Sequence, residues 1–177
     1  MRSSLRWLAV PLALVATVGI VACDDDDDPN EPNIETFTAT LNGQNERPTP
    51  RTTPATGTAT ITVTDDATLS WDIDMTGLTN LSMAHIHIGD ANTAGGIILD
   101  LSTGTFTNAN ISGSIDEADF PAPAPPNAAV TFQDLLDLMR TGLAYVNVHT
   151  DDGNATPNEG PGDFPGGEIR GQLAEVP

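Results

Sequence analysis

The sequence predicts an all-β fold, an antiparallel β-sandwich or barrel of about eight strands with one short helix. Residues 57–64 and 68–75 each alternate apolar and polar side chains. This period of two is typical of strands that bury one face, and a short turn between two such strands favours an antiparallel hairpin. Thr, Gly, Asn and Pro are abundant and Lys is absent. That composition favours strands and turns over a helical bundle.

The first 23 residues have the pattern of a targeting segment and are set apart from the fold. Arg2 and Arg6 precede an apolar stretch, residues 7–21, that is too short for a comfortable transmembrane helix. The stretch leads to Cys23, the only cysteine, in a sequence that resembles a bacterial lipobox. The resemblance implies that Cys23 is lipidated and anchors the chain to a membrane outside the cytoplasm. An ordinary secretory signal or a single anchoring helix is the alternative. The inner membrane, the outer membrane and the cell surface all remain open as locations.

Residues 24–33 are expected to form an extended, disordered tether. They begin with five consecutive aspartates and contain two prolines, so charge repulsion and missing amide donors oppose a helix. Residues 34–177 then form the folded domain. The net charge of the chain is −19, which disfavours binding to nucleic acid or anionic lipid through charge.

The domain is expected to contain further strands and one helix. Thr131 is suited to cap the helix, with Asp134 three positions later, and Gly142 is suited to end it. This helix is too short to be stable alone, so we expect it to cover an open end of the β core. The weak strand 106–115 is expected to be interrupted by Gly113. The other strands are expected at residues 34–41, around 83–88, 96–101, 145–149 and 167–176.

Three histidines are the candidate functional residues. His85 and His87 are two apart and project from the same face of an extended strand, while His149 ends a similar apolar run. If the three imidazoles meet, they can bind Zn²⁺ or Cu²⁺ and leave a coordination position open. The alternative is a polar network that joins neighbouring strands without a metal. No other arrangement typical of catalysis is present in the sequence.

Several segments together resemble the CHRD domain, a family named for chordin and also found in bacterial secreted proteins. The resemblance implies an immunoglobulin-like β-barrel with distant similarity to Cu/Zn superoxide dismutase. The matching segments are residues 37–43 with Gln44, Glu46 and Pro48, residues 84–87, residues 145–150 and residues 166–172.

The likeness to superoxide dismutase implies roles for individual residues. His85, His87 and His149 stand where that family has copper ligands, and Arg170 stands where it has an arginine that guides the anion. Asn147, Asp151 and Glu168 are then expected to orient the ligands as second-shell groups. The chain has no further histidine for a bridging ligand or a zinc site. The resemblance therefore allows at most a mononuclear copper or zinc site.

Two functional hypotheses follow from these residues. The first is a membrane-anchored extracytoplasmic lipoprotein that acts as a non-enzymatic binding or structural module, with or without one metal ion on the three histidines. Its partners are the membrane, through the lipid anchor, and an unidentified protein or cell surface. The second is a copper-dependent redox enzyme with dismutase-like chemistry, which requires Arg170 near the open metal position. The acidic surface disfavours the second hypothesis, because it repels an anionic substrate.

Overall fold

The computed structural model of the chain describes residues 31–121, 130–154 and 160–177. The predicted targeting segment 1–23, with Cys23, lies outside the described residues, as does most of the predicted tether 24–33. No helix in the described part of the chain has the length and apolarity needed to cross a membrane.

The described residues form an all-β domain with one short α-helix, which confirms the predicted fold class. The strands all pair antiparallel, and two 3₁₀ turns, η1 (Gly43–Asn45) and η2 (Glu117–Asp119), lie between them. The larger elements are β1 (Ile34–Asn42), β2 (Thr56–Thr64), β3 (Thr68–Thr76), β4 (Leu81–Ile88), β5 (Ile97–Asp100), β6 (Thr105–Phe106), β7 (Asn110–Asp116), α1 (Phe132–Arg140), β8 (Ala144–Thr150), β9 (Ile169–Gln172) and β10 (Ala174–Glu175).

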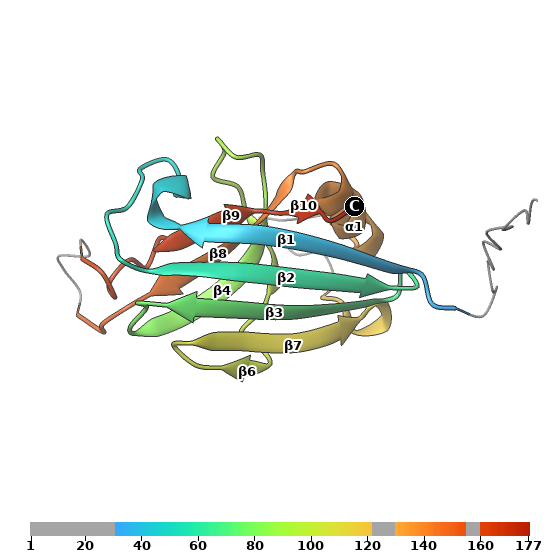
Figure 1. Cartoon of the computed structure of the whole chain (residues 1–177), viewed down its shortest axis with the longest axis horizontal. Helices are drawn as coiled ribbons and strands as arrows, with labels where there is room; N and C mark the ends of the chain where they lie inside the picture. The colour runs from blue at the N-terminus through green and yellow to red at the C-terminus, as the bar shows by residue number, and fades with distance from the viewer. Residues whose placement is uncertain (1–30, 122–129, 155–159) are drawn as a thin grey trace, which may run out of the picture. The chain divides into compact units, whose positions relative to one another are not determined.

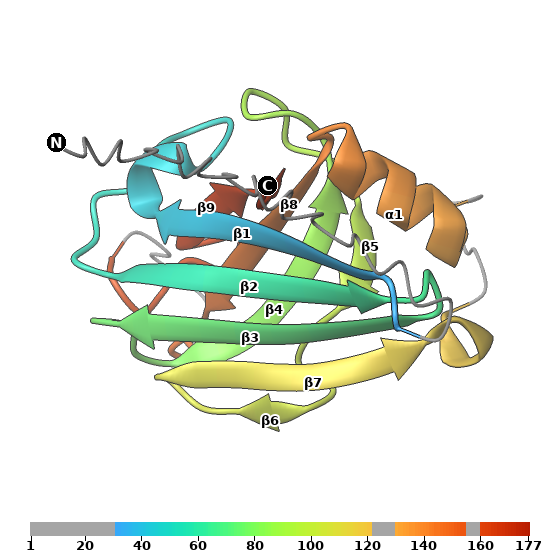
Figure 2. The same ribbon diagram turned by 45° about the vertical axis from the view of Figure 1, so that its right-hand side comes forward.

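One continuous sheet curls back on itself as a half-barrel. Its strand order is β5-β4-β8-β9-β1-β2-β3-β7-β6, with β10 paired to β1 beside this path. Figures 1 and 2 show β1, β2, β3 and β7 side by side in one layer, with β4 and β8 crossing behind them at an angle. This curvature gives the sheet an inner face that encloses the core and an outer face on β4, β8 and β9 that carries polar side chains.

The hydrophobic core lies between the two layers of the curled sheet. Strands β2 and β3 supply their alternating apolar residues, as the sequence pattern predicts, and the Trp71 indole donates a hydrogen bond across the core to the Leu101 carbonyl (3.0 Å). The core includes Phe37, Ile61, Leu69, Trp71, Ile73, Ile86, Leu101, Ile111, Val146, Val148 and Ile169.

The predicted helix is confirmed as α1, and it closes one open side of the curled sheet (Figure 2). Thr131 caps it: its side chain accepts from the Asp134 amide, and Asp134 accepts in turn from the Thr131 amide. Such a reciprocal cap satisfies two amides that would otherwise have no partner at the helix start. The apolar side of α1 packs into the core, and Gly142 follows the helix with a φ of 69°.

The prediction that Gly113 interrupts this strand is wrong. The strand is interrupted at residues 107–109, and Gly113 lies inside β7, paired with Trp71 of β3. A Cβ at Gly113 would lie 2.5 Å from the indole ring of Trp71. Glycine is therefore needed at this position to make room for the tryptophan, and not to turn the chain.

We predict that Gly113→Ala lowers the free energy of unfolding by about 1–3 kcal/mol, because the new methyl group overpacks the contact with Trp71. Urea unfolding followed by tryptophan fluorescence measures this. Ser114→Ala, at the next and exposed position, is the control and should change stability by less than about 0.5 kcal/mol. Equal effects of the two substitutions would contradict the proposed packing role.

Candidate metal centre

The pairing of β4 with β8 brings the three histidines together on the outer face of the sheet. His85 lies opposite Asn147, His87 opposite Tyr145, and Met83 opposite His149. Since side chains alternate along a strand, Ala84 and Ile86 point into the core while the histidines point away from it. The histidines are nevertheless buried, with exposures of only 5–7%.

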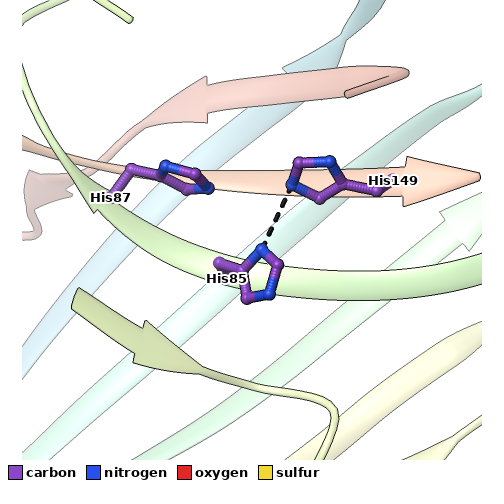
Figure 3. A group of neighbouring side chains, drawn as sticks. All are labelled: His85, His87 and His149. Atoms are coloured by element: carbon purple, nitrogen blue, oxygen red, sulfur yellow. Dashed lines mark hydrogen bonds between the residues drawn. The ribbon is translucent and has the colours of Figure 1, made fainter. Parts of the chain in front are cut away.

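The three imidazole rings form a compact cluster (Figure 3). Ring centroids are 4.9 Å apart for His85 and His149, 5.5 Å for His85 and His87, and 5.8 Å for His87 and His149. One nitrogen from each ring lies within 4.8 Å of the other two. The three imidazoles therefore meet in the structure, as the metal hypothesis requires.

Two main-chain carbonyls determine which ring nitrogens carry protons. Nδ1 of His149 lies 2.9 Å from the Pro165 oxygen, and Nδ1 of His87 lies 3.0 Å from the Gly95 oxygen. A carbonyl oxygen only accepts, so each Nδ1 is the donor and each Nε2 of these two neutral rings keeps a lone pair. Nδ1 of His85, 3.2 Å from Nε2 of His149, then donates to it.

The Nε2 atom of His87 is buried and has no hydrogen-bond partner among the described residues. A buried polar atom without a partner costs free energy, and such atoms are rare in folded proteins. A lone pair left free inside a cluster of imidazoles is the arrangement expected of a metal ligand.

Burial keeps the imidazoles neutral. Desolvation lowers the pKa of His85 to about 4, helped by the charge of His149, and desolvation also lowers the pKa of His87 to about 4. The pKa of His149 is lowered for the same reason, although its hydrogen bond to Pro165 opposes the shift. At neutral pH the three rings are uncharged and their lone pairs are available to a cation.

The donor set fits a borderline transition metal such as zinc or copper. Two nitrogens bound tetrahedrally to one Zn²⁺ at about 2.0–2.1 Å lie roughly 3.3 Å apart. The separation of Nδ1 of His85 and Nε2 of His149, 3.2 Å, is close to this value. A metal ion on Nε2 of His87, Nε2 of His149 and Nδ1 of His85 would replace the hydrogen bond between the last two atoms, with the proton of His85 moved to its Nε2.

Arg170 does not face the histidines directly. Its guanidinium lies over the ring of Tyr145, 3.4 Å from the ring centroid, and donates to the Asp90 carbonyl (2.6 Å). The other neighbour of Tyr145 is His87, which stacks on it with 5.0 Å between centroids. The ring of Tyr145 therefore lies between the guanidinium and His87, although the charge of Arg170 still contributes to the lowered pKa of His87.

The other residues expected to orient the ligands have different contacts. Within the described part of the chain, none of Asn147, Asp151, Glu168 and Arg170 forms a hydrogen bond to a histidine ring. Glu168 is fully buried and accepts from the Thr53 and Thr150 hydroxyls and the Gly162 amide. It joins the loop at Thr53, the end of β8 at Thr150 and the loop at Gly162.

Asn147 packs against a buried glutamate instead of a histidine. A Cβ at Gly167 would lie 2.7 Å from the Asn147 amide group and 2.9 Å from Oε1 of Glu46. Burial raises the pKa of Glu46 to about 7, although the charges of Arg170 and Arg51 and a hydrogen bond from Asn147 oppose the shift. Glu46, which follows η1, is thus a further buried titratable group beside Asn147 of β8.

The sequence did not reveal the groups that hold the imidazoles in place. The Gly95 and Pro165 carbonyls belong to loops, and no side-chain pattern marks a main-chain acceptor. Tyr145 could have been found, because it shares a strand face with Asn147 and His149. Its hydroxyl accepts from the Gly95 amide (2.9 Å), which positions the carbonyl that binds His87.

The described residues form an antiparallel half-barrel with a buried three-histidine cluster on β4 and β8. The CHRD domain family model matches residues 37–157, and the chain belongs to this family. The match includes all three histidines and ends before Glu168 and Arg170. A search of curated proteins finds no match to the chain.

We predict that the metal-free protein loses stability as the pH falls. A histidine titrates near 6.5 in the unfolded chain, whereas His85 and His87 titrate near 4 when folded, so the unfolded chain binds more protons between these values. The free energy of unfolding should therefore fall from about pH 6.5 to about pH 4. Urea titrations with a chelator present measure this.

His87→Asn should reduce the dependence on pH, because it removes one of the two groups. Glu46 contributes a pH dependence of opposite sign, because its stabilising effect is lost as the pH rises toward 7. This contribution is present in both wild type and variant, so it cancels when their free energies of unfolding are compared. Identical pH profiles for wild type and variant would contradict the lowered pKa of His87.

Proposed function

We propose that this CHRD-domain protein is a membrane-anchored, extracytoplasmic binding module that holds one transition-metal ion on His85, His87 and His149. The observation that carries the proposal is the free lone pair of Nε2 of His87, buried beside two other neutral imidazoles. A purely structural polar network would be expected to satisfy that atom. The bound ion would be zinc or copper, with a coordination position left for a partner.

The placement of Arg170 favours a binding role over the copper-dependent redox alternative. An anion-guiding arginine acts by projecting its charge to the position where the anion binds. Here the guanidinium is stacked on Tyr145 and is bound to the Asp90 carbonyl. The net charge of −19 further disfavours an anionic substrate.

The anchoring part of the proposal rests on the sequence before the domain. A basic start, an apolar stretch and Cys23 are followed by an acidic, Pro-containing segment that is suited to a flexible spacer. Two or three acyl chains at Cys23 would hold the domain firmly at a membrane surface.

We predict that the full-length chain, purified in detergent, binds one Zn²⁺ or Cu²⁺ with high affinity. Alanine substitution of His85, His87 or His149 should weaken binding at least about 100-fold, since loss of an outer partner of a ligand already costs 10- to 100-fold. Isothermal titration calorimetry and elemental analysis measure affinity and stoichiometry.

Asp119→Asn is the control for metal that binds to the acidic surface. Asp119 is exposed and lies on η2, so its replacement should leave binding unchanged. Failure of the wild-type protein to retain a stoichiometric ion, or equal affinity in the histidine variants, would refute the metal site.

We predict that mass spectrometry of the mature protein finds an acylated Cys23 as its first residue. Cys23→Ser should abolish the lipid and reduce the share of the protein in the membrane fraction, because no other cysteine can take its place. A mature chain that begins elsewhere and carries no lipid would refute the anchor, and leaves the metal site untouched.

A further inference from the structure

A second group of acidic side chains lies where the loop after β8 returns toward the sheet. Asp151, Asp152 and Asp163 each offer a carboxylate oxygen, and these oxygens lie within 4.8 Å of one another. Like charges at this distance repel each other, and the net charge of −19 provides no general compensation. The proximity alone would not identify a site, because exposed acidic groups often cluster without a ligand.

The burial of Asp163 provides a second, independent observation. Its exposure is 8%, so it is more than nine-tenths buried, and its Oδ1 has no hydrogen-bond partner. Within the described part of the chain, no donor lies within hydrogen-bond distance of this oxygen. A buried carboxylate needs donors or a cation, because the loss of hydration is otherwise not compensated.

Glu168 shows how the same loop satisfies a buried carboxylate when it is purely structural. Glu168 is fully buried, and three donors contact its two oxygens at 2.5–2.8 Å: the Thr53 hydroxyl, the Thr150 hydroxyl and the Gly162 amide. Asp163 is the neighbour of Gly162 but receives none of these hydrogen bonds. The contrast indicates that the compensating partner of Asp163 is a cation shared with Asp151 and Asp152.

The turn at Asn80 holds the two sides of the loop together. The Asn80 carbonyl accepts from the Asp151 amide (2.9 Å), and its side-chain amide donates to the Gly162 carbonyl (3.0 Å). Asn80 has a φ of 53°, an uncommon left-handed conformation for a residue other than glycine. The aspartates are therefore brought together by the folded domain and not by the acidic loop alone.

We propose that Asp151, Asp152 and Asp163 bind a calcium ion, at a site distinct in its ligands from the three histidines. Ca²⁺ takes oxygen ligands at 2.3–2.6 Å, so two oxygens on the same ion are at most about 5 Å apart. The 4.8 Å limit of this cluster satisfies that condition. Asp151 and Asp152 are exposed, which leaves room for the water molecules that complete calcium coordination.

The site should be of the weak, extracellular type. Three carboxylates, two of them exposed, supply only part of the six to eight oxygens that Ca²⁺ requires. Extracellular calcium modules have dissociation constants of about 10⁻⁴–10⁻³ M, and we expect a value in that range. Mg²⁺ should bind more weakly, because it requires a smaller and more regular octahedral set.

Calcium titration of the chelator-treated, full-length chain in detergent tests the proposal. Isothermal titration calorimetry should find one site, and Asp163→Asn, which keeps the shape but removes the charge, should weaken binding at least tenfold. Asp119→Asn should bind like wild type. Without calcium, Asp163→Asn should have a melting temperature no lower than wild type, because it removes charge repulsion.

Two results would overturn the proposal. One is the absence of binding by wild type up to about 10 mM Ca²⁺, well above the expected range. The other is equal affinity in Asp163→Asn and Asp119→Asn. If Asp163→Asn does not fold, Asp151→Asn replaces it, because that residue is exposed; it should also weaken binding at least tenfold, and unchanged affinity would refute the site. Neither outcome bears on the histidines, since Ca²⁺ selects oxygen ligands.

Discussion

The antiparallel register of β4 and β8 is the constraint on which both the core and the site depend. In this register Ala84 and Ile86 face the core while His85 and His87 face outward beside Tyr145 and Asn147. A slip of one residue would exchange the two faces and place imidazoles in the apolar core. The register that buries the apolar residues is therefore the same one that brings His149 to the other two histidines.

Burial of three imidazoles costs free energy, and hydrogen bonds to loop carbonyls offset only part of it. The Gly95 and Pro165 carbonyls each fix one ring, and Tyr145 in turn fixes Gly95. Nε2 of His87 is left without a partner. The carboxylate of Glu168, by contrast, accepts three hydrogen bonds from the protein itself. Among the described residues, Oε1 of Glu46, Oδ1 of Asn147 and Oε1 of Gln172 are also buried without a partner, so it is the cluster of three neutral imidazoles that marks His87 as a ligand.

Sequence reasoning was most reliable where a strict pattern reports local geometry. Such patterns depend only on neighbours in the chain. They include the alternation in β2 and β3, the cap at Thr131 and the spacing of His85 and His87. The position of the break near Gly113 was wrong, because the reason for that glycine is Trp71 on another strand. The sequence likewise could not show that Arg170 stacks on Tyr145, or that loop carbonyls orient the rings, since these contacts depend on how distant segments fold together.

We propose that three imidazoles on β4 and β8 bind one ion. X-ray absorption spectroscopy of the zinc- or copper-loaded protein tests it most directly, because imidazole rings give a characteristic scattering pattern. The account predicts three imidazole nitrogens at about 2.0–2.1 Å, falling to two when His87 is replaced by alanine. A first shell of oxygen ligands only, unchanged in that variant, would mean that the metal binds at the acidic surface and would contradict the account.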